Sequence, residues 1–168
     1  MALGDYLHLQ DTAYPWDPSA FTPMCRAFMN ADRQEVYNFV ADVMVMNYDE
    51  FLNTIYWGIV KGYVLSTHPI CTCGSQFGLQ VHHKTYAHHG EEHRYLDDLQ
   101  VKCRLCHKEI HGLATVEDMM KIEKNRQKAG QFRQSKPNAG GDVEHVSVTA
   151  VPLIKRMPLP GKGGKTAK

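Results

Sequence analysis

Four of the five cysteines lie within one short window of the sequence, which constrains the fold more than any other feature. The window runs from Cys71 to Cys106, and Cys25 stands apart from it. The first residues carry neither the basic nor the apolar segment of a secretory signal, so we expect a cytoplasmic protein. In that setting clustered cysteines indicate metal ligands rather than disulfides.

The spacing within this window predicts one structural zinc site. Cys103 and Cys106 are separated by two residues, which lets both thiolates face one tetrahedral ion. Cys71 and Cys73 have a single residue between them, with Ile70 where a two-residue spacer would place sulfur. We predict that all four thiolates bind zinc. The alternatives are a site of three thiolates, in which Cys71 is spare, and a site that holds no metal.

Seven of the ten histidines fall between His82 and His111, in the same part of the chain. His107 and His111 are four residues apart, so a helix would place both imidazoles on one face. His82 and His83 are neighbours in a strand-like segment, where successive side chains point to opposite faces. One of them can complete a metal site, and the other is free to do chemistry. For His8, His68 and His145 we expect surface or satisfied core positions. His88, His89 and His93 lie in a loop with Gly90, where we expect them to be solvated or, as the alternative, to contact phosphate when protonated.

Hydrophobic periodicity predicts two helices before the cysteine window. Residues 32–47 have apolar side chains at helical spacing with Asp32 placed to cap, and residues 48–66 carry one broad apolar face. Inside the window, residues 77–83 and 99–103 predict two short strands. A helix follows from residue 104 and either ends near Gly112 or continues to residue 128. From residue 131 onward the composition is typical of a mobile linker.

Charge is distributed unevenly along the chain although the net charge is +1. Residues 1–70 have a net charge of −5, residues 71–120 of −2 and residues 121–168 of +8. A basic end on an acidic chain suggests an anionic partner such as nucleic acid, and the alternative is a solvated tail. No stretch is long and apolar enough to predict a membrane span.

Residues 71–112 resemble the HNH endonuclease family, the ββα-metal nucleases, in the form found in phages and bacteria. The matching motifs occur in order: a cysteine knuckle ending in Cys-Gly, a strand ending in His-His and a loop with Gly90 and Glu92. A second strand and the motif Cys-x2-Cys-His-x3-His follow. Residues 48–65 are also similar to the helical lead-in of such proteins.

The resemblance implies an α+β fold with a ββα-metal core and a structural zinc knuckle. A small helical region would precede this core, and a flexible basic tail would follow it. We therefore expect an N-terminal helical region at residues 1–47, a nuclease domain with its lead-in at residues 48–128 and a basic tail at residues 129–168.

The resemblance also implies a role for individual residues. His82, His107 and His111 would bind a catalytic divalent metal (Mg, Mn, Ni or Zn), and His83 would be the general base that activates water. Asp98 stands where the family usually has an asparagine that ties the loop and orients the base. An aspartate cannot donate a hydrogen bond as an amide does. The expected reaction is phosphodiester hydrolysis with 5′-phosphate and 3′-hydroxyl products.

The leading hypothesis is therefore a metal-dependent endonuclease that acts on double-stranded DNA. One alternative is a non-catalytic, zinc-stabilised module that binds nucleic acid. Another is a zinc-stabilised adaptor that holds a protein partner through the helices of residues 32–65. The basic side chains expected to follow the DNA backbone are Lys121, Lys124, Arg126, Lys128, Arg133 and Lys136.

Overall fold

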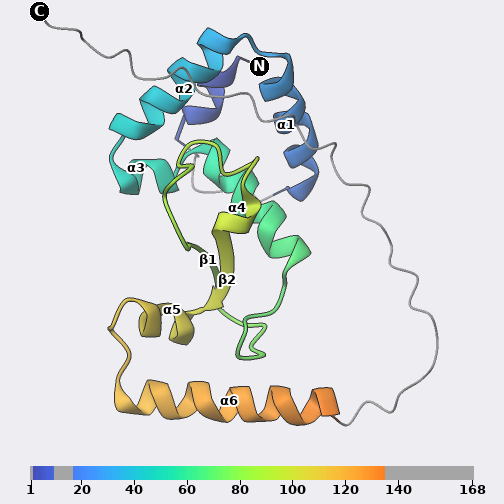
Figure 1. Ribbon diagram of the computed structural model, residues 1–168, viewed down its shortest axis with the longest axis vertical. Helices are drawn as coiled ribbons and strands as arrows, with labels where there is room; N and C mark the ends of the chain where they lie inside the picture. Colours follow the sequence, from blue (N-terminus) through green and yellow to red (C-terminus); the bar gives the residue numbers. More distant parts are fainter. Residues whose placement is uncertain (1, 10–16, 135–168) are drawn as a thin grey trace, which may run out of the picture. The chain divides into compact units, whose positions relative to one another are not determined.

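The computed structural model describes residues 2–9 and 17–134, which combine helices with one two-stranded antiparallel sheet (Figure 1). The predicted mixture of helix and strand is confirmed. The 3₁₀ helices are η1 (Leu3–Leu7), η2 (Pro18–Ala20) and η3 (Leu96–Asp98). The α-helices are α1 (Phe21–Asn30), α2 (Arg33–Val45), α3 (Tyr48–Leu52), α4 (Ile55–Thr67), α5 (Arg104–Ile110) and α6 (Val116–Gln134). The strands are β1 (Leu79–His83) and β2 (Leu99–Cys103).

Helix α2 forms where its sequence predicts. The Asp32 side chain accepts a hydrogen bond of 2.8 Å from the backbone N–H of Glu35, which satisfies one of the free donors of the first turn. Phe39 and Val43, one turn apart, are its buried residues. A capped N-terminus and one buried face are enough to hold this helix on the core.

The prediction of a single helix at residues 48–66 is wrong. The chain forms two helices there, α3 and α4, with a break at Asn53 and Thr54. The Thr54 hydroxyl donates to the carbonyl of Phe51 and accepts from the backbone N–H of Trp57, so it ends one helix and caps the next. The backbone of Thr54 also forms a β-bridge with Leu9. An apolar pattern that runs through both helices conceals this break.

One apolar core joins the N-terminal helices to the sheet. Phe28 of α1 and Phe39 of α2 meet edge to face at 4.9 Å, and Phe39 contacts Tyr56 of α4 at 5.1 Å. Leu99 and Val101 of β2 belong to the same buried cluster. The described parts of the regions expected at residues 1–47 and 48–128 therefore share a core, and residues 2–9 and 17–134 belong to one compact unit.

Both predicted strands are confirmed, and their register decides where the two adjacent histidines point. Val81 pairs with Val101, His82 with Gln100, and His83 with Leu99. Val81 packs against the apolar core, and His83 two residues later is buried. His82 lies on the opposite face of the strand, as the two-residue period requires.

The helix that follows β2 ends near Gly112 and does not continue to residue 128, so the first of the two alternatives for this segment is correct. Helix α5 stops at Ile110, and Gly112 adopts a positive φ of 67°. Thr115 and Asp118 then cap α6, because each side chain accepts from the backbone N–H of the other.

Helix α6 reaches Gln134, beyond the predicted domain boundary at residue 128. The rest of the expected tail, from residue 135, lies outside the described residues. None of the helices within residues 2–9 and 17–134 combines the length and apolar character that a bilayer crossing needs.

His93 is a buried imidazole in the core between α1 and α4. Its Nδ1 lies 3.0 Å from the Tyr56 hydroxyl, its ring centroid lies 4.1 Å from that of Phe28, and its Nε2 has no hydrogen-bond partner among the described residues. Burial and then the nearby Arg94 lower the pKa of His93 to about 3, against a small opposing effect of Glu92. The folded chain therefore holds this ring neutral.

We expect acid to destabilise the fold through His93. Below the ordinary histidine pKa of 6.5 the unfolded chain binds a proton that the folded chain excludes. The free energy of unfolding therefore decreases as the pH decreases. The loss from this group between pH 6.5 and the ordinary glutamate pKa of 4.5 is about 2 kcal/mol. The free energy of unfolding, measured with urea at several pH values, should depend less steeply on pH in His93→Phe than in the wild type. The variant His68→Ala, at an exposed site, should keep the wild-type dependence of the free energy of unfolding on pH. The same dependence in His93→Phe as in the wild type would contradict the expectation.

Candidate metal centres

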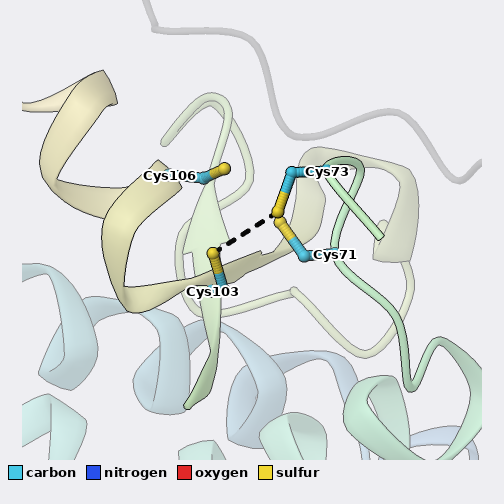
Figure 2. Close-up of side chains that lie close together, drawn as sticks. All are labelled: Cys71, Cys73, Cys103 and Cys106. Atoms are coloured by element: carbon cyan, nitrogen blue, oxygen red, sulfur yellow. Dashed lines mark hydrogen bonds between the residues drawn. The ribbon is translucent and has the colours of Figure 1, made fainter. Parts of the chain in front are cut away.

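Four cysteine side chains from three parts of the chain converge as the sequence predicts (Figure 2). Cys71 and Cys73 precede β1, Cys103 ends β2 and Cys106 lies on α5. All four are buried, and their Sγ atoms lie within 4.8 Å of one another, with 3.6 Å between Cys73 and Cys103. A tetrahedral zinc with bonds of about 2.3 Å places its sulfurs about 3.8 Å apart. The cluster could therefore hold a structural metal such as zinc.

The one-residue spacing of Cys71 and Cys73 is accommodated by a tight turn. The backbone N–H of Gly74 donates to the carbonyl of Cys71 at 2.8 Å, and the N–H of Cys71 donates to the carbonyl of Ser75 at 2.9 Å. Burial raises the pKa of the Cys71 thiol, but backbone N–H groups of Cys73 and Cys103 outweigh it and lower the pKa to about 7. Cys71 thus lies with the other thiols, in surroundings that favour the metal-binding thiolate.

Helix α6 packs directly on the cysteine cluster. Ile122 is fully buried among the four thiols. A Cβ at Gly74 would lie 2.7 Å from the Cβ of Ala129, so only glycine permits this approach. Arg126 and Glu109 form an ion pair of 2.8 Å between α6 and α5. The cluster therefore fixes both helices that follow the sheet.

His82, His107 and His111 also converge, as predicted. One ring nitrogen of each lies within 4.8 Å of the others, and the ring centroids are 4.6–5.2 Å apart. Burial first, and then the neighbouring imidazoles, lower the pKa values of His82 and His107. The neutral rings that a metal requires are therefore favoured. His111 is exposed, so one side of the group faces solvent. These three residues could bind a divalent metal.

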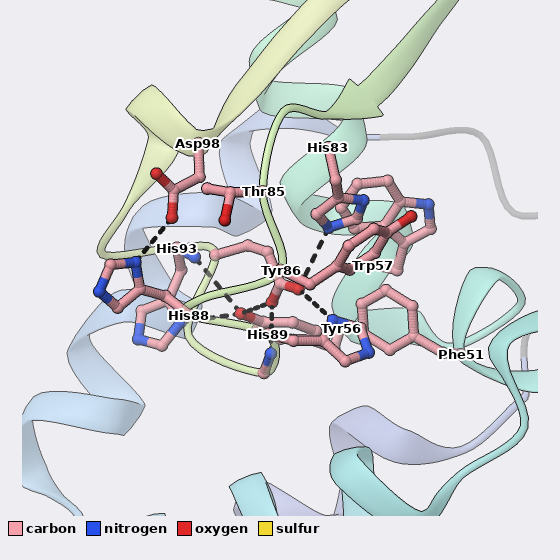
Figure 3. A network of polar contacts seen from close by, with 12 residues as sticks. Phe51, Tyr56, Trp57, His83, Thr85, Tyr86, His88, His89, His93 and Asp98 are labelled. Carbon is pink, nitrogen blue, oxygen red and sulfur yellow. Dashed lines mark hydrogen bonds and ion pairs between the residues drawn. The ribbon is translucent and has the colours of Figure 1, made fainter. Parts of the chain in front are cut away.

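His83, the predicted base, lies in a separate buried site (Figure 3). Its ring stacks between Trp57 of α4 and Tyr86 of the loop, at centroid distances of 4.7 and 4.8 Å. Its Nε2 lies 3.3 Å from Oε1 of Glu92, and its Nδ1 has no hydrogen-bond partner among the described residues. The ring is thus fixed in orientation and keeps one nitrogen without a partner.

Asp98, which was predicted to orient the base, contacts a different histidine. Its carboxylate lies 2.6 Å from Nδ1 of His88, whose ring stacks on Tyr95 at 3.6 Å. Its backbone carbonyl accepts from the N–H of Lys84 at 2.7 Å, which ties the end of β1. Within the described residues no hydrogen bond joins the Asp98 side chain to His83.

Glu92 and His89 were not among the predicted site residues, yet they lie beside His83. His89 was expected to be solvated or to contact phosphate, but its Nδ1 lies 2.8 Å from Oε1 of Glu92, and the Glu92 side chain is only 2% exposed. Together with His83 they form a third group whose ligand atoms lie within 4.8 Å of one another. The sequence signal was Glu92 two residues after Gly90 in a loop crowded with histidines.

We expect the cysteine cluster to be required for stability. In Cys73→Ser one thiolate ligand is lost, so the free energy of unfolding in the presence of zinc should fall by more than about 3 kcal/mol. Substitution of zinc by cobalt should give thiolate-to-cobalt absorption in the wild type, and this band should be weakened in the variant. Cys25→Ala, which alters a cysteine outside the cluster, should keep the band. Full absorption and stability in Cys73→Ser would contradict a structural metal at these thiols.

The histidine group is expected to bind a second divalent ion. In protein whose cysteine cluster is filled with zinc, isothermal titration with further zinc should show one more site. His107→Ala should weaken this site by about 100-fold because it removes one of three ligands. His68→Ala serves as the matched surface control and should bind as the wild type does. Equal affinity in His107→Ala would exclude this histidine as a ligand.

Comparisons with known proteins identify no family for this chain. A scan against protein-family models finds no match for the chain, and searches among curated proteins and among solved structures find none either. The case for a function therefore depends on the geometry of the three side-chain groups and on the sequence motifs that place them.

Proposed function

We propose that the chain is a metal-dependent endonuclease that hydrolyses phosphodiester bonds in double-stranded DNA, as its resemblance to the HNH endonucleases implies. One observation carries the proposal: adjacent residues of β1 serve two different groups. His82 joins His107 and His111, whereas His83 is held separately, and its Nδ1 has no hydrogen-bond partner in the part of the chain that the structure describes. A candidate metal site and a candidate base thus flank the same strand.

The chemistry of each group suits this reaction. Three neutral imidazoles would leave a bound divalent metal its full positive charge, which stabilises the charge that develops on a phosphate and its leaving oxygen. His83 takes a proton from water at Nδ1, and the water oxygen forms a bond to phosphorus. The bond from phosphorus to the 3′ oxygen breaks, and that oxygen takes a proton from solvent. The products carry a 5′-phosphate and a 3′-hydroxyl.

The basic face of α6 supports a nucleic-acid substrate. Lys124 and Lys128 are exposed, and in the described part of the chain neither has an ion-pair partner. Lys121 is exposed as well, although it pairs with Glu117 at 2.7 Å. Exposed lysines along one helix can neutralise backbone phosphates and would make binding weaken as salt rises. The side chains of Arg133 and Lys136, also expected to contribute, lie outside the described residues.

One observation favours the second candidate, a non-catalytic zinc module that binds nucleic acid. His83 is buried, and aromatic rings cover both faces of its imidazole. A general base must come within hydrogen-bond reach of water, whereas a purely structural histidine need not. The two candidates share DNA binding and zinc, so only cleavage separates them.

The first test is nicking of supercoiled plasmid by zinc-loaded protein with added Mg, Mn, Ni or Zn. We expect the wild type to nick with at least one of these metals. His83→Ala should reduce the rate by about 100-fold or more, because it removes the proton acceptor. His68→Ala, a histidine outside all three groups, should retain the wild-type rate.

If the wild type binds plasmid and zinc but nicks with none of the four metals, the non-catalytic module replaces the endonuclease. If His83→Ala nicks as fast as the wild type, this histidine is not the base.

A further inference from the structure

Glu92 is a buried carboxylate at the centre of a hydrogen-bond network that includes His83, His89 and Tyr56. Its Oε1 lies 3.3 Å from Nε2 of His83 and 2.8 Å from Nδ1 of His89. Its Oε2 accepts from the Tyr56 hydroxyl at 2.9 Å and from the backbone N–H of Gly90 at 3.0 Å. Both oxygens are therefore engaged, by partners from α4, β1 and the loop.

The carboxylate is ionised in this setting. Burial alone would raise the pKa of Glu92, but the hydrogen bonds from His83 and His89 outweigh it and lower the pKa to about 2. An ionised carboxylate can only accept hydrogen bonds, so each partner must donate. His83 therefore carries its proton on Nε2 when neutral, and its Nδ1 presents a lone pair. This is the nitrogen that has no partner among the described residues.

We propose that Glu92 is the positioning residue for the general base: it fixes the Nε2–H tautomer and the orientation of His83, so that Nδ1 accepts the proton from water. The inference rests on the proposed endonuclease function. It gives Glu92 the role that the resemblance to the HNH endonucleases implies for Asp98, whose carboxylate contacts His88 instead.

Glu92 is itself fixed in position by hydrogen bonds from Tyr56 and Gly90. Tyr56 is fully buried on α4, so its hydroxyl is a fixed donor. Gly90 adopts a φ of +89°, and a Cβ there would lie 3.4 Å from the side chain of Val43, so glycine lets the loop turn against α2. A carboxylate anchored from two elements restricts the imidazole more than a solvated one would, because neither side chain is free to rotate.

The side chains of His83, His89 and Glu92 could instead bind a metal ion, and this role must be distinguished from positioning of the base. A tetrahedral metal with bonds of about 2.0 Å would hold its ligand atoms about 3.3 Å apart, close to the distances between Glu92 and the two histidines. Hydrogen bonding already accounts for all four contacts of the carboxylate without an ion. We therefore argue for positioning, and metal content is one readout of the test.

The experiment compares full-length wild type with Glu92→Gln, a substitution of equal size that removes the charge. Glu91→Gln is the matched control, since Glu91 is the adjacent carboxylate and pairs with Arg94. Three quantities are measured: steady-state nicking of plasmid, bound zinc per chain, and the tautomer of His83 from the nitrogen chemical shifts of the imidazole. His83→Gln assigns the resonances.

We expect His83 in the wild type to carry its proton on Nε2. Glu92→Gln should lower kcat by about 100-fold with little change in KM, keep the wild-type zinc content, and mix the two tautomers. Glu91→Gln should match the wild type in all three. A proton on Nδ1 in the wild type, an unchanged kcat in Glu92→Gln, or the loss of one zinc per chain would each overturn the proposal.

The readouts keep this inference apart from the function on which it rests. A wild type that never nicks plasmid overturns the endonuclease, and with it any catalytic meaning of Glu92. The tautomer of wild-type His83 still decides whether the carboxylate fixes the ring, and it requires no variant of Glu92 to fold.

Discussion

The contact among four buried thiols organises the part of the chain that contains the candidate metal sites. Within the described residues, the apolar cluster around these thiols contains few other side chains, with Ile122 its one buried hydrophobic residue besides the cysteines. Thiols packed this closely repel one another once ionised, so a shared cation would make their convergence favourable. The cluster joins the turn before β1, the end of β2 and α5. It thereby places His107 of α5, and His111 directly after that helix, against the face of β1 that carries His82.

Strand geometry explains why two adjacent histidines can have unlike surroundings. Successive side chains of β1 point to opposite faces, so His82 meets the imidazoles of α5 while His83 enters the core beside Trp57. A shift of one residue in the register would exchange these environments. The pairing of Val81 with Val101, on the face that packs against the apolar core, opposes such a shift because it would turn Val81 away from the core.

Local patterns in the sequence predicted the elements and the ligand groups, because those depend on short spacings. The strands, the cap at Asp32 and the convergence of the cysteines all follow from such spacings. The division of residues 48–66 into two helices depends on the Thr54 side chain, which an apolar pattern does not reveal. The partner of His83 was missed for another reason. Glu92 was visible as a loop residue, but its burial depends on Tyr56, which lies 36 positions away in the sequence.

Burial of Glu92 also has a cost that bears on its role. A carboxylate removed from water is unfavourable unless donors surround it, and apolar residues of similar size often stabilise a fold as well or better. Core packing alone therefore does not account for an ionised group at this position. Its donors include two imidazoles, and the one on β1 keeps a lone pair at its other nitrogen. Trp57 closes one face of that ring with 2% of its surface exposed, whereas Tyr86 on the other face is 52% exposed. The Nδ1 atom of His83 is itself buried, so the proposed reaction requires water to enter past one of these rings, and Tyr86 is the more exposed of the two.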